Sequence, residues 1–159
     1  MLELKKSFKN IQDNEKFIEW KKEHFGSYLT NAFLNDNEWQ FDFLDPKSEM
    51  MTSFKFNDKD LFFEESEIFR KEKKEIKELN LEEVKIDLDK AEDLIEKIID
   101  SDYKNEDIQK KIIILQVIEK LVWNITYITK SFNVLNVKLN AVNGEIINHS
   151  MESLLNFKS

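Results

Sequence analysis

The spacing of apolar residues changes along the chain from a helical period to a strand period. In the first 25 residues, apolar side chains recur at intervals of three and seven, at Phe8, Ile11, Ile18 and Phe25. This spacing is typical of one face of an amphipathic helix. Asp13 and Asn14 interrupt the stripe, so the pattern fits one helix or two. Gly26 follows at a position suited to a helix C-terminus.

From Ser27 onward the period is two, which indicates strands. We expect three strands near residues 28–34, 39–43 and 53–56, where apolar and polar positions alternate. The connections at 35–38 and 45–48 contain Asn, Asp and Pro, which favour turns. An antiparallel meander is therefore predicted for residues 28–56.

Residues 58–86 are ambiguous. Leu61–Phe63 predicts a fourth strand, but the charged stretch that follows also fits an exposed helix carrying Phe69, Ile76 and Leu79. We favour a strand that ends near Phe69, followed by a charged connector.

The second half of the chain has a clearer pattern. Asp87 is positioned to cap a helix over residues 87–100, whose apolar stripe includes Ala91 and Ile95. Three apolar runs between Ile112 and Ile147 are separated by short polar breaks, which predicts a second meander. Asn143-Gly144 is the strongest hairpin signal in the chain, because both residues tolerate a positive φ.

The two halves align with each other. An offset of 84 residues pairs Trp39 with Trp123, and an offset of 83 pairs Phe54 with Val137. This alignment predicts a tandem repeat. The expected fold class is α+β, with two αβββ(β) repeats at residues 1–80 and 81–159, each an antiparallel meander covered by one helix.

Residues 84–149 resemble a PepSY domain, a small αβ module with a cystatin-like arrangement. The resemblance depends on Asp87 and Ala91 in the helix, on Trp123 and Tyr127 in the middle strand, and on the turn at 140–147. In that turn, Ala141, Gly144 and Glu145 match the pattern of the family, whereas Asn140 and Asn143 replace its Asp and Thr. The first half matches only in outline. The resemblance implies a module that holds or inhibits peptidases.

Composition narrows the classes of partner. The 159 residues carry a net charge of −8, which disfavours binding to a phosphate backbone, and contain no cysteine for disulfides or thiolate metal sites. No stretch of 18 apolar residues suggests a membrane segment, and the first ten residues lack the apolar core of a signal peptide. We therefore expect a soluble cytoplasmic protein, although removal of an export signal would leave the same sequence.

Candidate catalytic chemistry is sparse. His24 and His149 lack metal-ligand spacing, so His24 is expected at a helix end and His149 on the surface after the last strand. Ser27 and Ser150 lack the context of a nucleophile elbow. The acidic cluster of Glu64, Glu65 and Glu67 lacks the pattern of a calcium loop, which favours a solvated face. No catalytic, cofactor or metal residue is predicted.

The strand at 112–118 carries apolar side chains on both faces, so both faces must be buried against another element or a partner. Because one helix covers only one face, we expect an interface, with the other repeat, a second chain or a ligand, at Ile112, Ile114, Ile118, Trp39 and Trp123. The two tryptophans also continue the apolar faces of their strands, which favours core positions.

Two classes of function follow from these patterns. The preferred prediction is a non-enzymatic module that binds a protein or peptide, with strand addition at a sheet edge as one mode and a homodimer as a further possibility. The alternative is a small-molecule-binding or enzymatic protein with a pocket between helix and sheet, for which Trp39, Trp123 and His149 are candidates.

Overall fold

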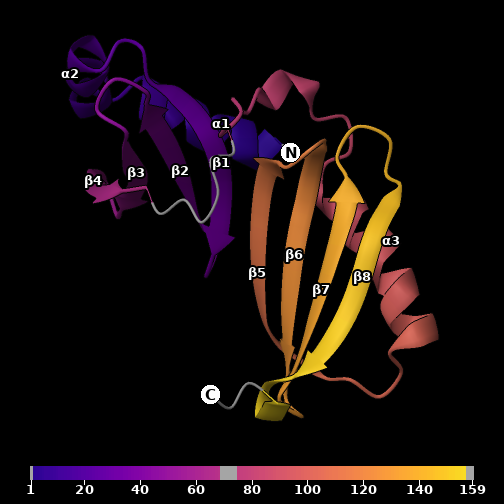
Figure 1. Ribbon diagram of the computed structural model, residues 1–159. Coiled ribbons are helices and arrows are strands. Elements are labelled where there is room, and N and C mark those ends of the chain that lie inside the picture. Colours follow the sequence, from indigo (N-terminus) through magenta and orange to yellow (C-terminus); the bar gives the residue numbers. More distant parts are fainter. Residues whose placement is uncertain (1, 69–74, 157–159) are drawn as a thin grey trace. The chain divides into compact units, whose positions relative to one another are not determined.

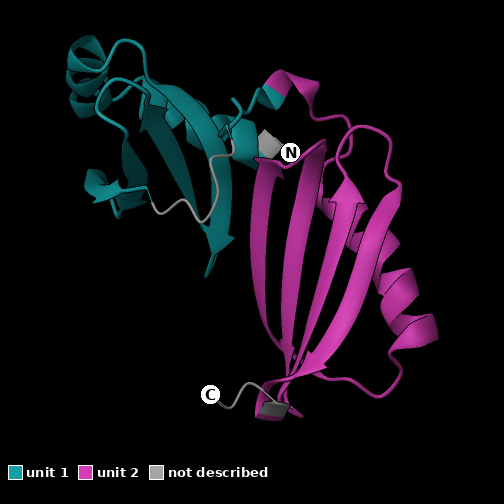
Figure 2. Cartoon of the chain, in the orientation of Figure 1, with its two compact units in different colours: residues 1–81 teal, residues 82–159 magenta. Residues whose placement is uncertain are grey.

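A computed structural model describes residues 2–68 and 75–156 of the chain (Figure 1). In chain order its elements are α1 (Leu2–Gln12), α2 (Glu15–Glu23), β1 (Tyr28–Asn35), β2 (Glu38–Asp45), β3 (Met50–Asn57), β4 (Asp60–Glu67), the 3-10 turn η1 (Leu81–Glu83), α3 (Leu88–Asp102), β5 (Ile108–Val117), β6 (Leu121–Thr129), β7 (Asn133–Asn140), β8 (Ile146–Ser153) and η2 (Leu154–Asn156). The chain divides into two compact units, Met1–Leu81 and Glu82–Ser159 (Figure 2).

The fold is α+β, but the predicted fold class of tandem meanders, each covered by one helix, is wrong. In unit 1 the strands follow the order β4-β3-β2-β1, and in unit 2 they follow the order β5-β6-β7-β8. The first half contains two helices instead of one, so the two halves are not copies of one unit covered by a single helix. The apolar stripe of the first 25 residues fits one helix or two, and its break at Asp13 and Asn14 is where the helices separate.

Unit 1 begins with the two helices that the break at Asp13 and Asn14 allowed. The side chain of Asn14 accepts a hydrogen bond from the backbone N–H of Lys16 at 2.9 Å and so caps α2. At the other end, His24 Nδ1 lies 2.8 Å from the carbonyl of Trp20, as expected for a residue at a helix end. The three predicted strands of the first half are confirmed as β1, β2 and β3.

The core of unit 1 contains a row of aromatic rings that crosses three strands. In the antiparallel register, Phe41 on β2 pairs with Phe54 on β3, and Phe54 pairs with Phe63 on β4. The rings of Phe17 and Trp20 from α2 pack on Phe54 at centroid distances of 5.1 and 4.8 Å. The covered face of the sheet is therefore aromatic as far as its outermost strand.

Unit 2 is a four-stranded antiparallel meander with α3 along one face (Figure 1). Asp87 caps α3, as predicted, by accepting a hydrogen bond from the N–H of Lys90 at 2.8 Å. Trp123 is fully buried, and its indole N–H donates to the carbonyl of Ile86 at 2.8 Å. α3 covers one face of this sheet. The buried apolar side chains of that face are Ile113, Leu115, Ile125, Tyr127, Leu135, Val137 and Leu139.

The opposite face of unit 2 carries a chain of amide hydrogen bonds. Lys138 Nζ donates to Asn136, Asn136 donates to Asn124, and Asn124 donates to Gln116, over distances of 2.7 to 2.9 Å. Asn136 also donates to Thr126 at 3.0 Å. The alternation of the strands thus separates an apolar face from a polar one.

Three local predictions need correction or completion. Asn143-Gly144 does not form a two-residue hairpin, because only Gly144 has a positive φ (81°) and Asn140 Oδ1 instead organises a longer loop by accepting from the N–H of Val142. His149 lies within β8 and not after it. The fourth strand is confirmed as β4, whereas the predicted end near Phe69 falls outside the described residues.

The packing of α3 predicts a large effect of truncating Ile95, which is fully buried. Ile95→Ala should lower the free energy of unfolding by about 2–5 kcal/mol, because the cavity adds to the lost apolar transfer energy. Ile147→Ala, at a side chain 43% exposed in the same unit, should change it by less than about 0.5 kcal/mol. Urea unfolding followed by circular dichroism measures both; similar values for the two variants would contradict this packing.

Candidate binding edge and neighbouring polar sites

β4 is an outermost strand of unit 1, and among the described residues it pairs only with β3. The hairpin that joins them has a two-residue loop between Asn57 and Asp60, with Asp58 at a φ of 57°. In such a hairpin the pair next to the loop is the hydrogen-bonded one, and bonded pairs then alternate along the strands. The backbone groups of Phe63, Glu65 and Glu67 therefore point to the outer edge.

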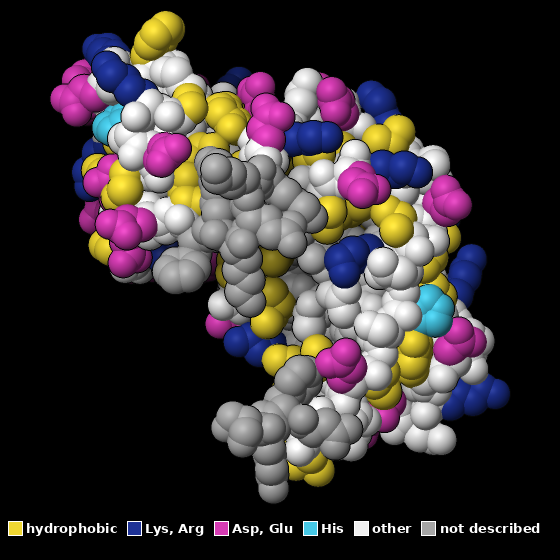
Figure 3. Space-filling view, in the orientation of Figure 1, with side chains coloured by type: hydrophobic (Ala, Val, Ile, Leu, Met, Phe, Trp, Pro, Cys, Tyr) yellow, Lys and Arg dark blue, Asp and Glu magenta, His cyan; other side chains and the backbone are white. Residues whose placement is uncertain are grey.

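The side chains of β4 are unusually exposed for a strand that carries two aromatic residues. Phe62 is 52% exposed and Phe63 is 44% exposed. The strand also has four carboxylates and no basic residue. Acidic and hydrophobic side chains lie side by side over this part of unit 1 (Figure 3).

None of the three glutamates of β4 lies directly opposite a cation on the neighbouring strand. Their partners on β3 are uncharged: Ser53 opposite Glu64, Thr52 opposite Glu65 and Met50 opposite Glu67. Among the described residues, no ion pair or hydrogen bond involves these three carboxylates. Lys16 Nζ donates to the backbone carbonyl of Leu61 on β4 at 3.4 Å.

Outer strands usually carry features that prevent other strands from pairing with them, such as lysines, prolines and bulges. β4 pairs with β3 over eight consecutive positions without a bulge. β8, an outer strand of unit 2, has an irregular register beside Lys138 and Leu139, and it lacks exposed aromatic residues. Of the two, β4 is the edge better suited to receive another strand.

The residues predicted from sequence to form an interface are not brought together. Trp39 belongs to unit 1 and is buried at a ring centroid distance of 6.2 Å from Phe41, while Trp123 is buried under α3 in unit 2. Ile112 and Ile114 are half-buried on the polar face of unit 2, and Ile118 is exposed just beyond β5. The sequence pattern missed the β4 edge, although Leu61–Phe63 followed by glutamates was a visible signal for it.

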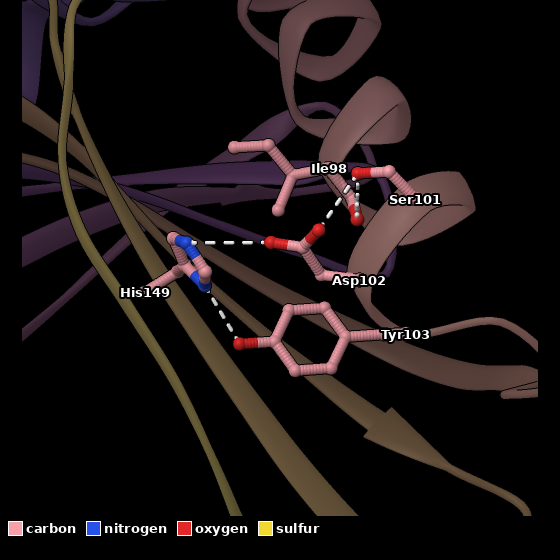
Figure 4. A network of polar contacts seen from close by, with 5 residues as sticks. All are labelled: Ile98, Ser101, Asp102, Tyr103 and His149. Carbon is pink, nitrogen blue, oxygen red and sulfur yellow. Dashed lines mark hydrogen bonds and ion pairs between the residues drawn. The ribbon is translucent and has the colours of Figure 1, made fainter.

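His149 takes part in a small polar network at the end of α3 (Figure 4). Its Nδ1 lies 2.6 Å from the hydroxyl of Tyr103, and its Nε2 lies 3.8 Å from Asp102 Oδ2. The hydroxyl of Ser101 donates to Asp102 at 3.0 Å and lies 3.3 Å from the carbonyl of Ile98. The network ties the last turn of α3 to β8.

This network contains serine, histidine and aspartate, but their order differs from that of a hydrolase triad. In a triad the histidine accepts the proton of the serine. Here Ser101 contacts Asp102, and the nearest hydroxyl to His149 is that of Tyr103. The arrangement therefore orients side chains at a helix end and does not activate Ser101.

A second serine lies beside a lysine in unit 1. Lys21 Nζ donates to Ser27 Oγ at 3.0 Å and also to the carbonyl of Ser27. Burial lowers the pKa of Lys21, and the nearby carboxylates of Glu78 and Asp45 oppose this shift. Because Ser27 is itself buried and the ammonium binds the main chain, the pair closes the connection between α2 and β1.

In residues 2–68 and 75–156, no three His, Cys, Asp or Glu side chains form a group that could hold a metal ion. None of the helices in these segments is long and apolar enough to cross a membrane.

The turn between β6 and β7 presents an exposed apolar tip. Phe132 has a φ of 61°, which is uncommon for a bulky residue, and is exposed together with Leu154 and Leu155. Glu106 holds this turn by accepting hydrogen bonds from Ser131 Oγ at 2.6 Å and from Asn133 Nδ2 at 2.8 Å.

Comparison with known proteins supports the fold only. No protein-family model and no curated protein sequence matches this chain. A crystal structure of a putative lipoprotein from Clostridium difficile 630 is similar in fold, with a TM-score of 0.55 and 13% sequence identity over 87% of this chain and 91% of the other. At this level of identity, the similarity carries no functional assignment.

The hydrogen bonds that the Glu106 carboxylate accepts predict a pH-dependent contribution to stability. The hydrogen bond from Ser131, with those from Asn133 and Thr129, lowers the pKa of Glu106 below its ordinary value, although burial opposes the shift. A lowered pKa in the folded state means that the contribution is present above the ordinary value near 4.5 and is lost as the pH falls through the folded-state value.

Glu106→Gln should therefore destabilise the protein at pH 7, and the difference from wild type should shrink below about pH 4. Urea unfolding between pH 3 and pH 7 measures this difference. Glu145→Gln, at an exposed loop residue in the same unit, is the matched control and should show no such pH dependence. If the free energy of unfolding of Glu106→Gln differed from that of wild type by the same amount at every pH in this range, the stabilising role of the Glu106 carboxylate would be contradicted.

Proposed function

We propose that this protein is a non-enzymatic binding module that takes up an extended segment of a protein or peptide by strand addition at β4. The observation that carries this proposal is the regular outer edge of β4, where two aromatic side chains are exposed and backbone groups lack a partner strand among the described residues. In strand addition, backbone hydrogen bonds supply affinity and alternate side chains supply specificity.

The polar clusters of the molecule are consistent with this choice. The hydroxyls of Ser101 and Ser27 are engaged by Asp102 and Lys21, respectively, in contacts that hold helix ends. For the alternative function, the three candidate residues Trp39, Trp123 and His149 lie in separate surroundings, and both tryptophans are buried.

The resemblance of residues 84–149 to PepSY modules agrees with a binding role, and it stays a prediction, as do the cytoplasmic location and the possible homodimer. A partner such as a peptidase would offer an extended segment to β4. The negative charge of the chain disfavours nucleic acid as that partner.

The test removes one outward backbone donor without removing a bond between β3 and β4. Glu65→Pro deletes the outward N–H, and proline is tolerated where that group faces away from the neighbouring strand. Glu65→Thr removes the same charge but keeps the N–H, so it is the matched control. Both variants should remain folded, which circular dichroism verifies.

Peptides selected from a displayed library of unstructured seven-residue sequences serve as probes. They should bind wild type and Glu65→Thr, and bind Glu65→Pro at least tenfold more weakly, as measured by fluorescence anisotropy. The same peptides carrying N-methyl groups at alternate positions should also lose affinity. Equal affinity for Glu65→Pro and Glu65→Thr, or failure to select any peptide, would contradict strand addition.

A further inference from the structure

We infer that the segment received by β4 is bipartite, with two adjacent apolar residues at one end and basic residues at the other. This inference rests on the proposed strand addition and specifies the chemistry of its ligand. The exposed side chains of β4 change type halfway along the strand, from Phe62 and Phe63 to Glu64, Glu65 and Glu67.

The apolar half follows from the aromatic row of unit 1. The row Phe41, Phe54 and Phe63 runs in register across β2, β3 and β4, and the Phe54 and Phe63 centroids lie 5.4 Å apart. Phe63 is the last member and is 44% exposed. A strand added beside β4 places its own side chain next in this row, where an apolar or aromatic residue would cover the ring.

Phe62 lies on the other face of β4 and is also exposed. Its partner on β3 is Lys55, so no aromatic ring lies opposite it on the neighbouring strand. The ligand residue beside Phe62 follows or precedes the residue beside Phe63, because successive side chains of a strand point to opposite faces. Two consecutive apolar residues in the ligand therefore cover both rings.

The basic half follows from the charges. Glu65 and Glu67 lie on the face of Phe63, while Glu64 lies on the face of Phe62, and all three face uncharged residues on β3. Lysine or arginine side chains on either face of the added strand would each meet a carboxylate that forms no ion pair with another described residue.

The same charges disfavour a second copy of β4 as the occupant. The antiparallel register that pairs all the outward backbone groups of two β4 strands would place Glu64 of each copy opposite Glu64 of the other and would bring eight carboxylates together. Like charges that face each other across strands are destabilising. A basic segment of another protein meets no such repulsion.

The experiment compares two labelled peptides on the full chain by fluorescence anisotropy. The basic peptide is Val-Tyr-Arg-Lys-Thr-Arg, and the neutral peptide is Val-Tyr-Gln-Gln-Thr-Gln; each is also made in reversed order, because the strand can add in either direction. At 50 mM salt, the better orientation of the basic peptide should bind about tenfold more tightly than its neutral counterpart. At 500 mM salt this advantage should largely disappear.

A triple variant tests whether the three glutamates of β4 cause the preference for the basic peptide. Glu64→Gln, Glu65→Gln and Glu67→Gln together should abolish the preference for the basic peptide and leave the affinity for the neutral one unchanged. As a matched control, Glu15→Gln, Glu19→Gln and Glu23→Gln on α2 remove the same charge from unit 1 and should preserve the preference.

The outcomes separate this inference from the proposed function. Equal binding of basic and neutral peptides, with both weakened by Glu65→Pro, would retain strand addition and overturn the bipartite ligand. Basic preference with no effect of Glu65→Pro would retain the charge complementarity and overturn strand addition. Self-association in sedimentation that the triple variant changes would assign the edge to a second copy and overturn the inference.

Discussion

The backbone of a β-strand must satisfy hydrogen-bonding groups on two edges, and in the part of the chain that the structure describes β4 has a strand partner on only one. A buried strand meets this constraint with two neighbours, whereas an outer strand leaves half of its N–H and C=O groups to water or to another chain. Because β4 pairs regularly with β3, its outward groups fall at alternate positions, at Phe63, Glu65 and Glu67. The candidate function of the protein depends on these groups.

The rest of unit 1 holds this edge in place. Phe54 forms the centre of the aromatic cluster, in contact with α2 on one side and with Phe63 on the other. The cap at Asn14 fixes the residue at which α2 begins. The start of the helix in turn sets which of its aromatic side chains pack on the sheet. Phe63 is therefore anchored in the core at one face while its edge remains open. Because this surface is already ordered, binding of a ligand would cost little conformational entropy of the protein.

Much of this fold was predictable from local sequence signals. Asp87 was identified as a helix cap and Trp123 as a core residue, because capping and strand alternation depend on residues close in sequence. The wrong fold class came from the assumption that the two halves repeat one pattern. The stripe of the first 25 residues was compatible with one helix or two, and the structure has two, α1 and α2. Asn143-Gly144 was misjudged because the side chain of Asn140 competes for the backbone of that loop.

The candidate site was only partly visible in the sequence. Leu61–Phe63 indicated a strand and the following glutamates indicated a solvated surface, but neither pattern identifies an outermost strand. The predicted interface residues followed from the apolar character of β5, yet Trp39 and Trp123 serve the cores of their own units. His149 became informative only with Tyr103 beside it, 46 residues away in the chain.

Amide hydrogen exchange measured by NMR on the full chain, with and without saturating basic peptide, tests the account most directly. The amides of Phe63 and Glu65 should exchange at least tenfold more slowly in the complex, because their N–H groups gain a partner. Those of Phe62 and Glu64, which already face β3, should change little by comparison. Uniform protection along β4, or no protection at Phe63 and Glu65 in a saturated complex, would contradict it.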